Sequence, residues 1–128
     1  MKNLSLIIDD PQRHYWAGQK LSGTVAWELA REPYAVEVRL FWITLGGTPT
    51  QVGVVEKRVF EKCAASGSGR FEFVLPGGPW SFAGSHVFLE WSVEAVILPS
   101  RENTRTSFTL GPEGSGTLIY IGQGVNRD

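Results

Sequence analysis

The sequence predicts an all-β domain: an antiparallel β-sandwich of about seven or eight strands with little or no helix. Apolar residues recur with a period of two along most of the chain, and no stretch of a dozen residues carries the 3.6-residue stripe of a helix. Turn-forming segments separate the apolar runs without intervening helices. The 128 residues, 42% of them hydrophobic, suffice for one domain with one core.

Residues 20–29 and 85–98 show the clearest alternation, because each has an apolar side and a largely polar side. In the second segment, Phe88 stands on the polar side and interrupts the pattern. Residues 35–45 begin with the same alternation and become apolar on both sides through residues 41–43. We therefore expect the second half of this strand to be covered on both faces.

Residues 51–62 alternate poorly, because Val54 and Val55 are adjacent. A β-bulge would reconcile the two halves of this strand. Shorter strands are expected at residues 4–8, 70–75, 104–110 and 118–121. Residues typical of turns fill the segments 31–34, 45–51, 65–69, 76–79 and 99–103.

The sandwich domain is expected to span residues 1–110. Residues 111–128 are rich in glycine around one short apolar run. This segment is interpreted as either a C-terminal tail or a last edge strand, and the two alternatives stay open.

Charged residues make up 20% of the chain, with 12 basic side chains against 13 acidic ones. This balance excludes a disordered chain, a basic nucleic-acid binder and a membrane-surface polycation. The single cysteine, Cys63, cannot form an internal disulfide, and no apolar run approaches the roughly 20 residues of a membrane span. The first residues lack the pattern of a signal peptide. We expect a cytoplasmic protein with no nucleic-acid partner and no membrane span.

Three segments together resemble the arrestin fold. YWAGQKLSGTV, residues 15–25, is similar to the opening in which an aromatic residue, a P/A-G-[EDQ] turn and an x-G-x-V strand follow the first strand. VEVRLFWITLGGT, residues 36–48, resembles the family's strand that ends in a glycine turn. FEFVLPGGPWSFAGSHVFLEWSVEAVI, residues 71–97, resembles its alternating strand, Leu-Pro, loop with Ser and Gly, and long strand with Val-x-Ala. Order and spacing match over about residues 15–110.

The resemblance implies an immunoglobulin-like sandwich of two antiparallel sheets, as in arrestins, the retromer-associated arrestin-like subunits and the bacterial sporulation-control proteins. Those proteins are adaptors rather than enzymes, so the resemblance implies a non-catalytic adaptor or scaffold that binds a protein partner. Most of them carry two tandem sandwiches, whereas this chain has room for one. The interdomain groove and the receptor-phosphate sensor of arrestins therefore have no counterpart here, and the partner's identity does not carry over.

The ionisable residues show no catalytic or metal-binding pattern. His14 is predicted in a loop and His86 on the polar side of its strand, without metal-ligand spacing. Cys63 has no oriented base near it in the sequence. Glu90 and Glu94 would lie about 13 Å apart at ~3.3 Å per residue, farther than the carboxylates of glycosidases. We expect no enzyme, no cofactor and no metal site, and a small hydrolase is the least favoured function.

The aromatic residues divide into core candidates and contact candidates. Three tryptophans at apolar strand positions are expected in the core: Trp27, Trp42 and Trp91. Trp16 and Trp80 fall in predicted loops beside Tyr15 and Phe82 respectively, and these four residues are candidates for binding a protein partner. Alternatively, the two loop tryptophans stack on a sugar ring in a carbohydrate-binding module, or they plug the two ends of the sandwich.

The irregular strand at residues 51–62 is the candidate edge strand. Free backbone groups at such an edge can pair with an extended peptide or with a second copy of the chain, which makes an edge-to-edge homodimer one expectation. Glu56, Lys57 and Arg58 suit a solvent-exposed edge and are further candidates for partner contact. The same charges can instead discourage pairing, and this alternative stays open.

Overall fold

The computed structural model describes residues 3–47, 49–84, 86–112 and 119–120, the last two as backbone only. Within these residues the regular structure consists of strands, and there is no helix that could span a membrane. The strands are β1 (Asn3–Ile8), β2 (His14–Trp16), β3 (Lys20–Glu28), β4 (Ala35–Leu45), β5 (Val52–Glu61), β6 (Ser66–Val74), β7 (Phe82–Ala83), β8 (Phe88–Leu98), β9 (Asn103–Gly111) and β10 (Ile119–Tyr120).

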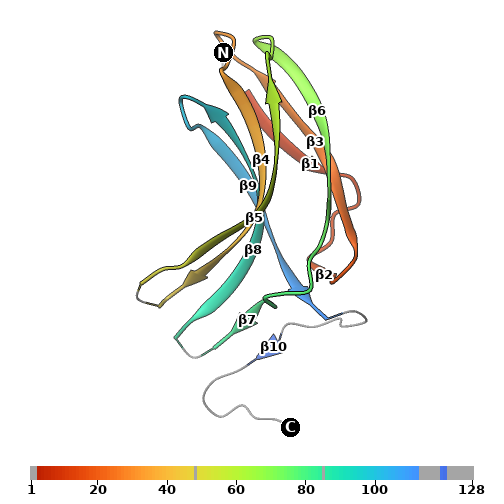
Figure 1. Cartoon of the computed structure of the whole chain (residues 1–128), viewed down its shortest axis with the longest axis vertical. Coiled ribbons are helices and arrows are strands. Elements are labelled where there is room, and N and C mark those ends of the chain that lie inside the picture. Colours follow the sequence, from red (N-terminus) through yellow and green to blue (C-terminus); the bar gives the residue numbers. More distant parts are fainter. Residues whose placement is uncertain (1–2, 48, 85, 113–118, 121–128) are drawn as a thin grey trace.

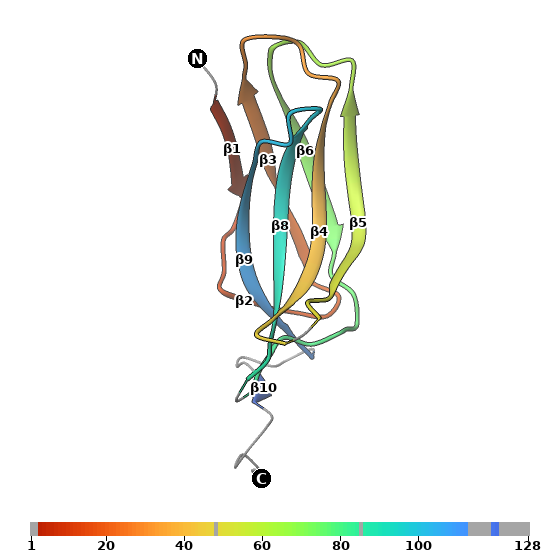
Figure 2. The ribbon, with the colours of Figure 1, turned by 90° about the vertical axis from the view of Figure 1, so that its left-hand side faces the viewer.

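Two sheets face each other, as Figures 1 and 2 show. The smaller sheet is antiparallel, in the order β1-β3-β6. In the larger sheet β5, β4 and β8 lie side by side, and the far edge of β8 is shared by β7 and β9. Two short pairings, β2 with β9 and β10 with β7, are parallel. In Figure 1 the lower halves of β4, β5 and β8 bend away from the smaller sheet, so the outer face of the larger sheet is concave.

The core fills the space between the sheets. Trp91 is fully buried and stacks on Phe108 with ring centroids 6.3 Å apart, and Tyr15 meets the same Phe108 edge-on at 5.1 Å. Trp27 is 6% exposed, and Trp42 is partly buried against the core cluster. The prediction of core tryptophans is therefore confirmed for Trp27 and Trp91, whereas Trp42 packs against the core from a partly buried position. Each large buried side chain contributes about 1.5–3 kcal/mol relative to leaving it in water.

The predicted β-bulge is confirmed. Leu40 of β4 pairs with Glu56 of β5, whereas the next residue, Phe41, pairs with Val54, so Val55 is left without a partner. The extra residue reconciles the two halves of β5, which alternate out of phase in the sequence.

The turn predicted at residues 65–69 is wrong, because β6 already begins at Ser66. A Cβ atom on Gly67 would lie 2.9 Å from the indole of Trp27, and one on Gly69 would lie 2.4 Å from the ring of Phe60. Glycine is therefore needed at these strand positions to make room for aromatic rings, not to form a turn.

Two short strands were not predicted: β2 lies in a predicted loop, and β7 is only two residues long. Part of the predicted strand at 118–121 appears as β10. Residues 113–118 and 121–128 lie outside the described residues, so the choice between tail and edge strand is open for most of that segment.

Candidate binding groove

The larger sheet forks along the edge of β8. From Asn103 to Phe108, β9 pairs with β8, where Phe108 lies opposite Trp91. Beyond Phe108, β9 diverges from β8 and pairs with β2. At the same edge of β8, β7 then pairs with β8, with Phe82 opposite Leu89. The divergence opens a hollow of about 630 Å³ between the two branches. We call this hollow the fork groove.

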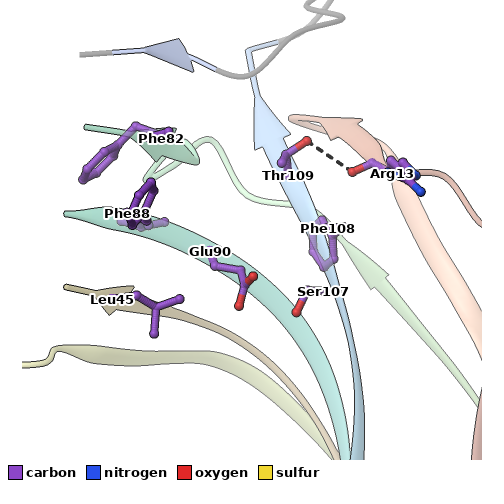
Figure 3. Close-up of a pocket in the computed structure, with 10 residues that line it drawn as sticks. Arg13, Leu45, Phe82, Phe88, Glu90, Ser107, Phe108 and Thr109 are labelled. Atoms are coloured by element: carbon purple, nitrogen blue, oxygen red, sulfur yellow. Dashed lines mark hydrogen bonds between the residues drawn. The ribbon is translucent and has the colours of Figure 1, made fainter. Parts of the chain in front are cut away.

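Residues from four strands and one loop line the fork groove, and residues of both faces of the sheet take part because the sheet is open at this point (Figure 3). They are Arg13, Leu45, Phe82, Ala83, Phe88, Leu89, Glu90, Ser107, Phe108 and Thr109.

The base of the fork is closed by Ser81, which lies just before β7. The backbone N–H of Leu110 donates to the Ser81 hydroxyl at 2.8 Å, and the backbone N–H of Ser81 donates to the Leu110 carbonyl at 2.8 Å. Ser81 is 1% exposed. Next to it, the indole Nε1 of Trp91 donates to the carbonyl of Pro79 at 2.7 Å. Because buried polar groups must be paired, these bonds hold the 79–81 segment in one position and the groove in one shape.

The apolar wall of the groove reaches solvent. Phe88 is 45% exposed and Leu45 is 39% exposed, and the two residues lie opposite each other in the β8–β4 register. Figure 3 shows Phe82 beside Phe88 at the same end of the hollow. Phe88 and Leu45 thus reach solvent at one end of the groove, beside Phe82, which packs partly against the core.

The polar side of the groove is largely satisfied internally. The Thr109 hydroxyl donates to the carbonyl of Arg13 at 3.2 Å and lies 2.7 Å from Nδ1 of His14. The Ser107 and Ser92 hydroxyls bond each other at 3.0 Å.

The concave face above the groove carries a charged row. Arg39 donates from Nε and Nη2 to one carboxylate oxygen of Glu37, at 3.0 and 2.8 Å, and Nζ of Lys57 lies 3.9 Å from the same oxygen. Glu37 is only 7% exposed although it faces outward. The curvature of the sheet therefore partly buries side chains on its outer face.

The sequence predicted that the second half of β4 is covered on both faces, and the outer face is covered only in part. Phe41, on the outer face, is 6% exposed, and the guanidinium of Arg105 lies 6.0 Å from its ring centroid. Within the described residues this cover comes from the curvature and from Arg105, not from a further layer, and Leu45 at the end of the strand is exposed.

The predicted aromatic contact residues do not form one surface. Tyr15 is 3% exposed, and burial raises the pKa of its phenol. It packs against Phe108 in the core, so the expectation that it offers a contact surface is wrong. Trp80 packs partly against the core, whereas Trp16 is 37% exposed. Phe82 does line the fork groove.

The two loop tryptophans do not plug opposite ends of the sandwich. Trp16 lies opposite Gly111 in the β2–β9 register, and Ser81, next to Trp80, bonds the neighbouring Leu110. Both tryptophans therefore lie near the same end, where β9 leaves β8.

The charged residues of β5 lie at the edge of the larger sheet, as predicted, because β5 pairs only with β4 within the described residues. They do not share one face. Lys57 joins the charged row on the outer face, whereas Arg58 lies 4.8 Å over the ring of Phe73 and donates to the Glu72 carbonyl at 2.9 Å. Glu56 pairs with Arg58 at 3.4 Å. Arg58 thus covers the opening between the two sheets, and its role in partner binding stays a prediction.

Phe88 and Leu45 were not among the sequence candidates. Phe88 was visible only as an interruption of the alternating pattern, and such a large apolar residue on a polar side is a usable signal of a surface site. Nothing in the sequence marks Leu45 as a surface-site residue, because it falls at the start of a predicted turn.

The remaining ionisable candidates show no catalytic arrangement. Cys63 is partly buried, its thiol donates to the Phe60 carbonyl at 3.2 Å, and burial raises its pKa. His86 is exposed in the segment before β8. Among the described residues no cluster of three or more His, Cys, Asp or Glu side chains is placed to hold a metal ion.

Comparisons with known proteins show the fold. No protein-family model matches the chain, and no curated protein sequence matches it. Among solved structures, the chain is similar to Spo0M, a sporulation control protein from Bacillus subtilis, with a TM-score of 0.54 and 12% sequence identity. The match covers 89% of this chain and 50% of the Spo0M chain, so this chain spans half of that structure's length. The predicted arrestin-like sandwich is therefore confirmed at the level of the fold.

Proposed function

We propose that this chain is a non-catalytic adaptor module that binds a segment of a protein partner in the fork groove. The observation that carries the proposal is the exposure of Phe88 and Leu45, 45% and 39%, side by side in a hollow of a concave face. Exposed apolar side chains that gather in a concave, polar-rimmed site are typical of partner-binding surfaces.

The frame around these residues supports the proposal. The branches of the fork are joined by the paired bonds between Ser81 and Leu110, and the segment before β7 is anchored to Trp91. A groove that is already formed costs a partner less ordering on binding than a mobile loop does.

The likeness to Spo0M supports a regulatory or adaptor role in a general way, since that protein is described as a sporulation control protein. The partner itself is not carried over at 12% identity. A cytoplasmic setting agrees with a chain whose single cysteine has no partner within the molecule.

The proposal is tested with peptides selected from a phage-displayed random library on the purified protein. The dissociation constants of the synthesised peptides are then measured by isothermal titration calorimetry. Phe88→Ser is expected to weaken binding about 10-fold or more, because truncation of a central aromatic contact has an effect of this size. Val74→Ser is the matched control, since Val74 is 54% exposed on β6 of the other sheet.

Equal affinity of the selected peptides for wild type, Phe88→Ser and Leu45→Ser would place the binding surface elsewhere and contradict the proposal. Thermal unfolding of each variant shows whether it keeps the fold, which is expected because both side chains lie at the surface.

A further inference from the structure

Glu90 is the acidic side chain of the fork groove. It lies on β8 opposite Ile43 of β4, and it faces the same side of the sheet as Phe88, two residues earlier. It is partly buried, and the described part of the chain gives it no hydrogen-bond or ion-pair partner. A carboxylate that loses part of its hydration without a compensating partner favours the approach of a cation.

The other polar side chains that line the groove do not pair with Glu90. The Thr109 hydroxyl is bonded to Arg13, and the Ser107 hydroxyl to Ser92. Arg13 precedes β2, which pairs with the edge of β9 that faces away from β8. Its guanidinium is therefore separated from Glu90 by the width of β9.

The other charges of the concave face lie apart from Glu90. Nearer the middle of the face, one row across the sheet contains Lys57, Arg39, Glu94 and Arg105. Even when Glu37 is counted, three cations stand there against two anions. This row thus carries an excess of one positive charge, whereas Glu90 lies about 13 Å from Glu94 at ~3.3 Å per residue and is separated by β9 from Arg13, the basic residue of the groove lining.

We infer that the fork groove recognises a lysine or arginine side chain of the partner, an inference that rests on the proposed function. The cationic head lies at Glu90, and the aliphatic stem lies along Phe88 and Leu45. Phe88 and Glu90 are two residues apart on one strand face, about 7 Å, and long basic side chains span such a distance with their stems on apolar surface. The occupant is an extended protein segment with one basic residue flanked by apolar residues.

The test uses fluorescein-labelled hexapeptide mixtures that differ at one fixed position, which holds Lys, Arg, Gln, norleucine or Glu. Fluorescence polarisation measures their binding. Wild type is expected to prefer the Lys and Arg mixtures, and Glu90→Gln to lose about 5- to 20-fold of this affinity. Glu90→Lys should shift the preference to the Glu mixture. Glu94→Gln is the matched control, because it removes a carboxylate from the same face of the same strand outside the groove.

The outcomes separate this inference from the proposed function. If wild type binds the mixtures without preference for a basic residue, or if Glu90→Gln keeps that preference, the recognition of a cation is wrong while the groove remains a peptide site. If wild type binds no mixture, the proposed function itself is contradicted. Light scattering that shows dimers lost in Glu90→Gln would identify a second copy as occupant and overturn the inference of a foreign partner.

Discussion

Ser81 and Leu110 satisfy each other's buried polar groups across the fork: the Ser81 hydroxyl accepts from the Leu110 N–H, and the Leu110 carbonyl accepts from the Ser81 N–H, both at 2.8 Å. Ser81→Ala removes the acceptor and leaves the N–H of Leu110 unpaired at a residue that is 1% exposed. We expect the free energy of unfolding to fall by about 1–3 kcal/mol, measured by urea unfolding with tryptophan fluorescence.

Ser66→Ala is the control for this change, because Ser66 is exposed at the start of β6. Its effect should stay within about 0.5 kcal/mol. If the two variants were equally stable, the closure of the fork would not depend on the Ser81 hydroxyl.

Gly53 lies under the indole of Trp42, across the β4–β5 pair. A Cβ atom on Gly53 would lie 2.3 Å from the ring, so Gly53→Ala must displace Trp42 from its place against the core. We expect a loss of about 1–3 kcal/mol of unfolding free energy. Gly77→Ala is the matched control, since a Cβ atom there meets nothing within 4 Å. A loss in Gly77→Ala as large as in Gly53→Ala would contradict the explanation by crowding.

The ion pair between Asp9 and Arg70 predicts a pH dependence of stability. Arg70 donates to Asp9 at 2.7 Å, and this bond lowers the pKa of the Asp9 carboxyl below the 3.8 of a free side chain. Because the pKa of Asp9 is lower in the folded state than in the unfolded state, the ionised carboxylate stabilises the fold above pH 3.8. This stabilisation is lost as the pH falls through the pKa of the folded state.

Asp9→Asn should therefore lower Tm slightly at pH 7, and the difference from wild type should shrink as the pH falls below about 4. Thermal unfolding followed by circular dichroism at a series of pH values measures both trends. A difference that grows toward acid would show that Asp9 is stabilised by something other than its charge.

Cys63 should react slowly with alkylating reagents in the folded protein. Burial raises the pKa of its thiol above 9.0, and the thiolate is the reactive form. At pH 8 we expect carbamidomethylation to be about 10-fold or more slower in the native chain than in urea, as followed by mass spectrometry. The midpoint of the native pH–rate profile should lie above 9.0. A native rate equal to the unfolded one would mean that the thiol is not shielded.

The long strands β3, β4 and β8 could be predicted from the sequence because one face of each packs against the core and the other faces outward, which gives alternating apolar and polar residues. The glycines of β6 could not be interpreted correctly, because the ring that lies against each of them belongs to another strand: Trp27 of β3 against Gly67, and Phe60 of β5 against Gly69. Local patterns record which side of a strand is buried, but not which ring will lie against it.

The fork groove was hidden for a related reason. In the sequence Phe88 stands out only as an exception to the alternating pattern, and Glu90 only as one of two carboxylates too far apart for a glycosidase. That they line one hollow follows from β7 and β9 sharing one edge of β8, which is a matter of strand pairing and not of local sequence. The short β2 has too few residues to show a period, and its place is given by its pairing with β9.

The parallel pairing of β2 with β9 joins His14 to Thr109, 95 positions further along the chain. During translation, β2 cannot pair with β9 until the chain has been synthesised through β9 and this part of it has left the ribosome. The groove therefore forms only after β9 has been synthesised, and a nascent chain that has not yet exposed β9 does not present this surface to a partner.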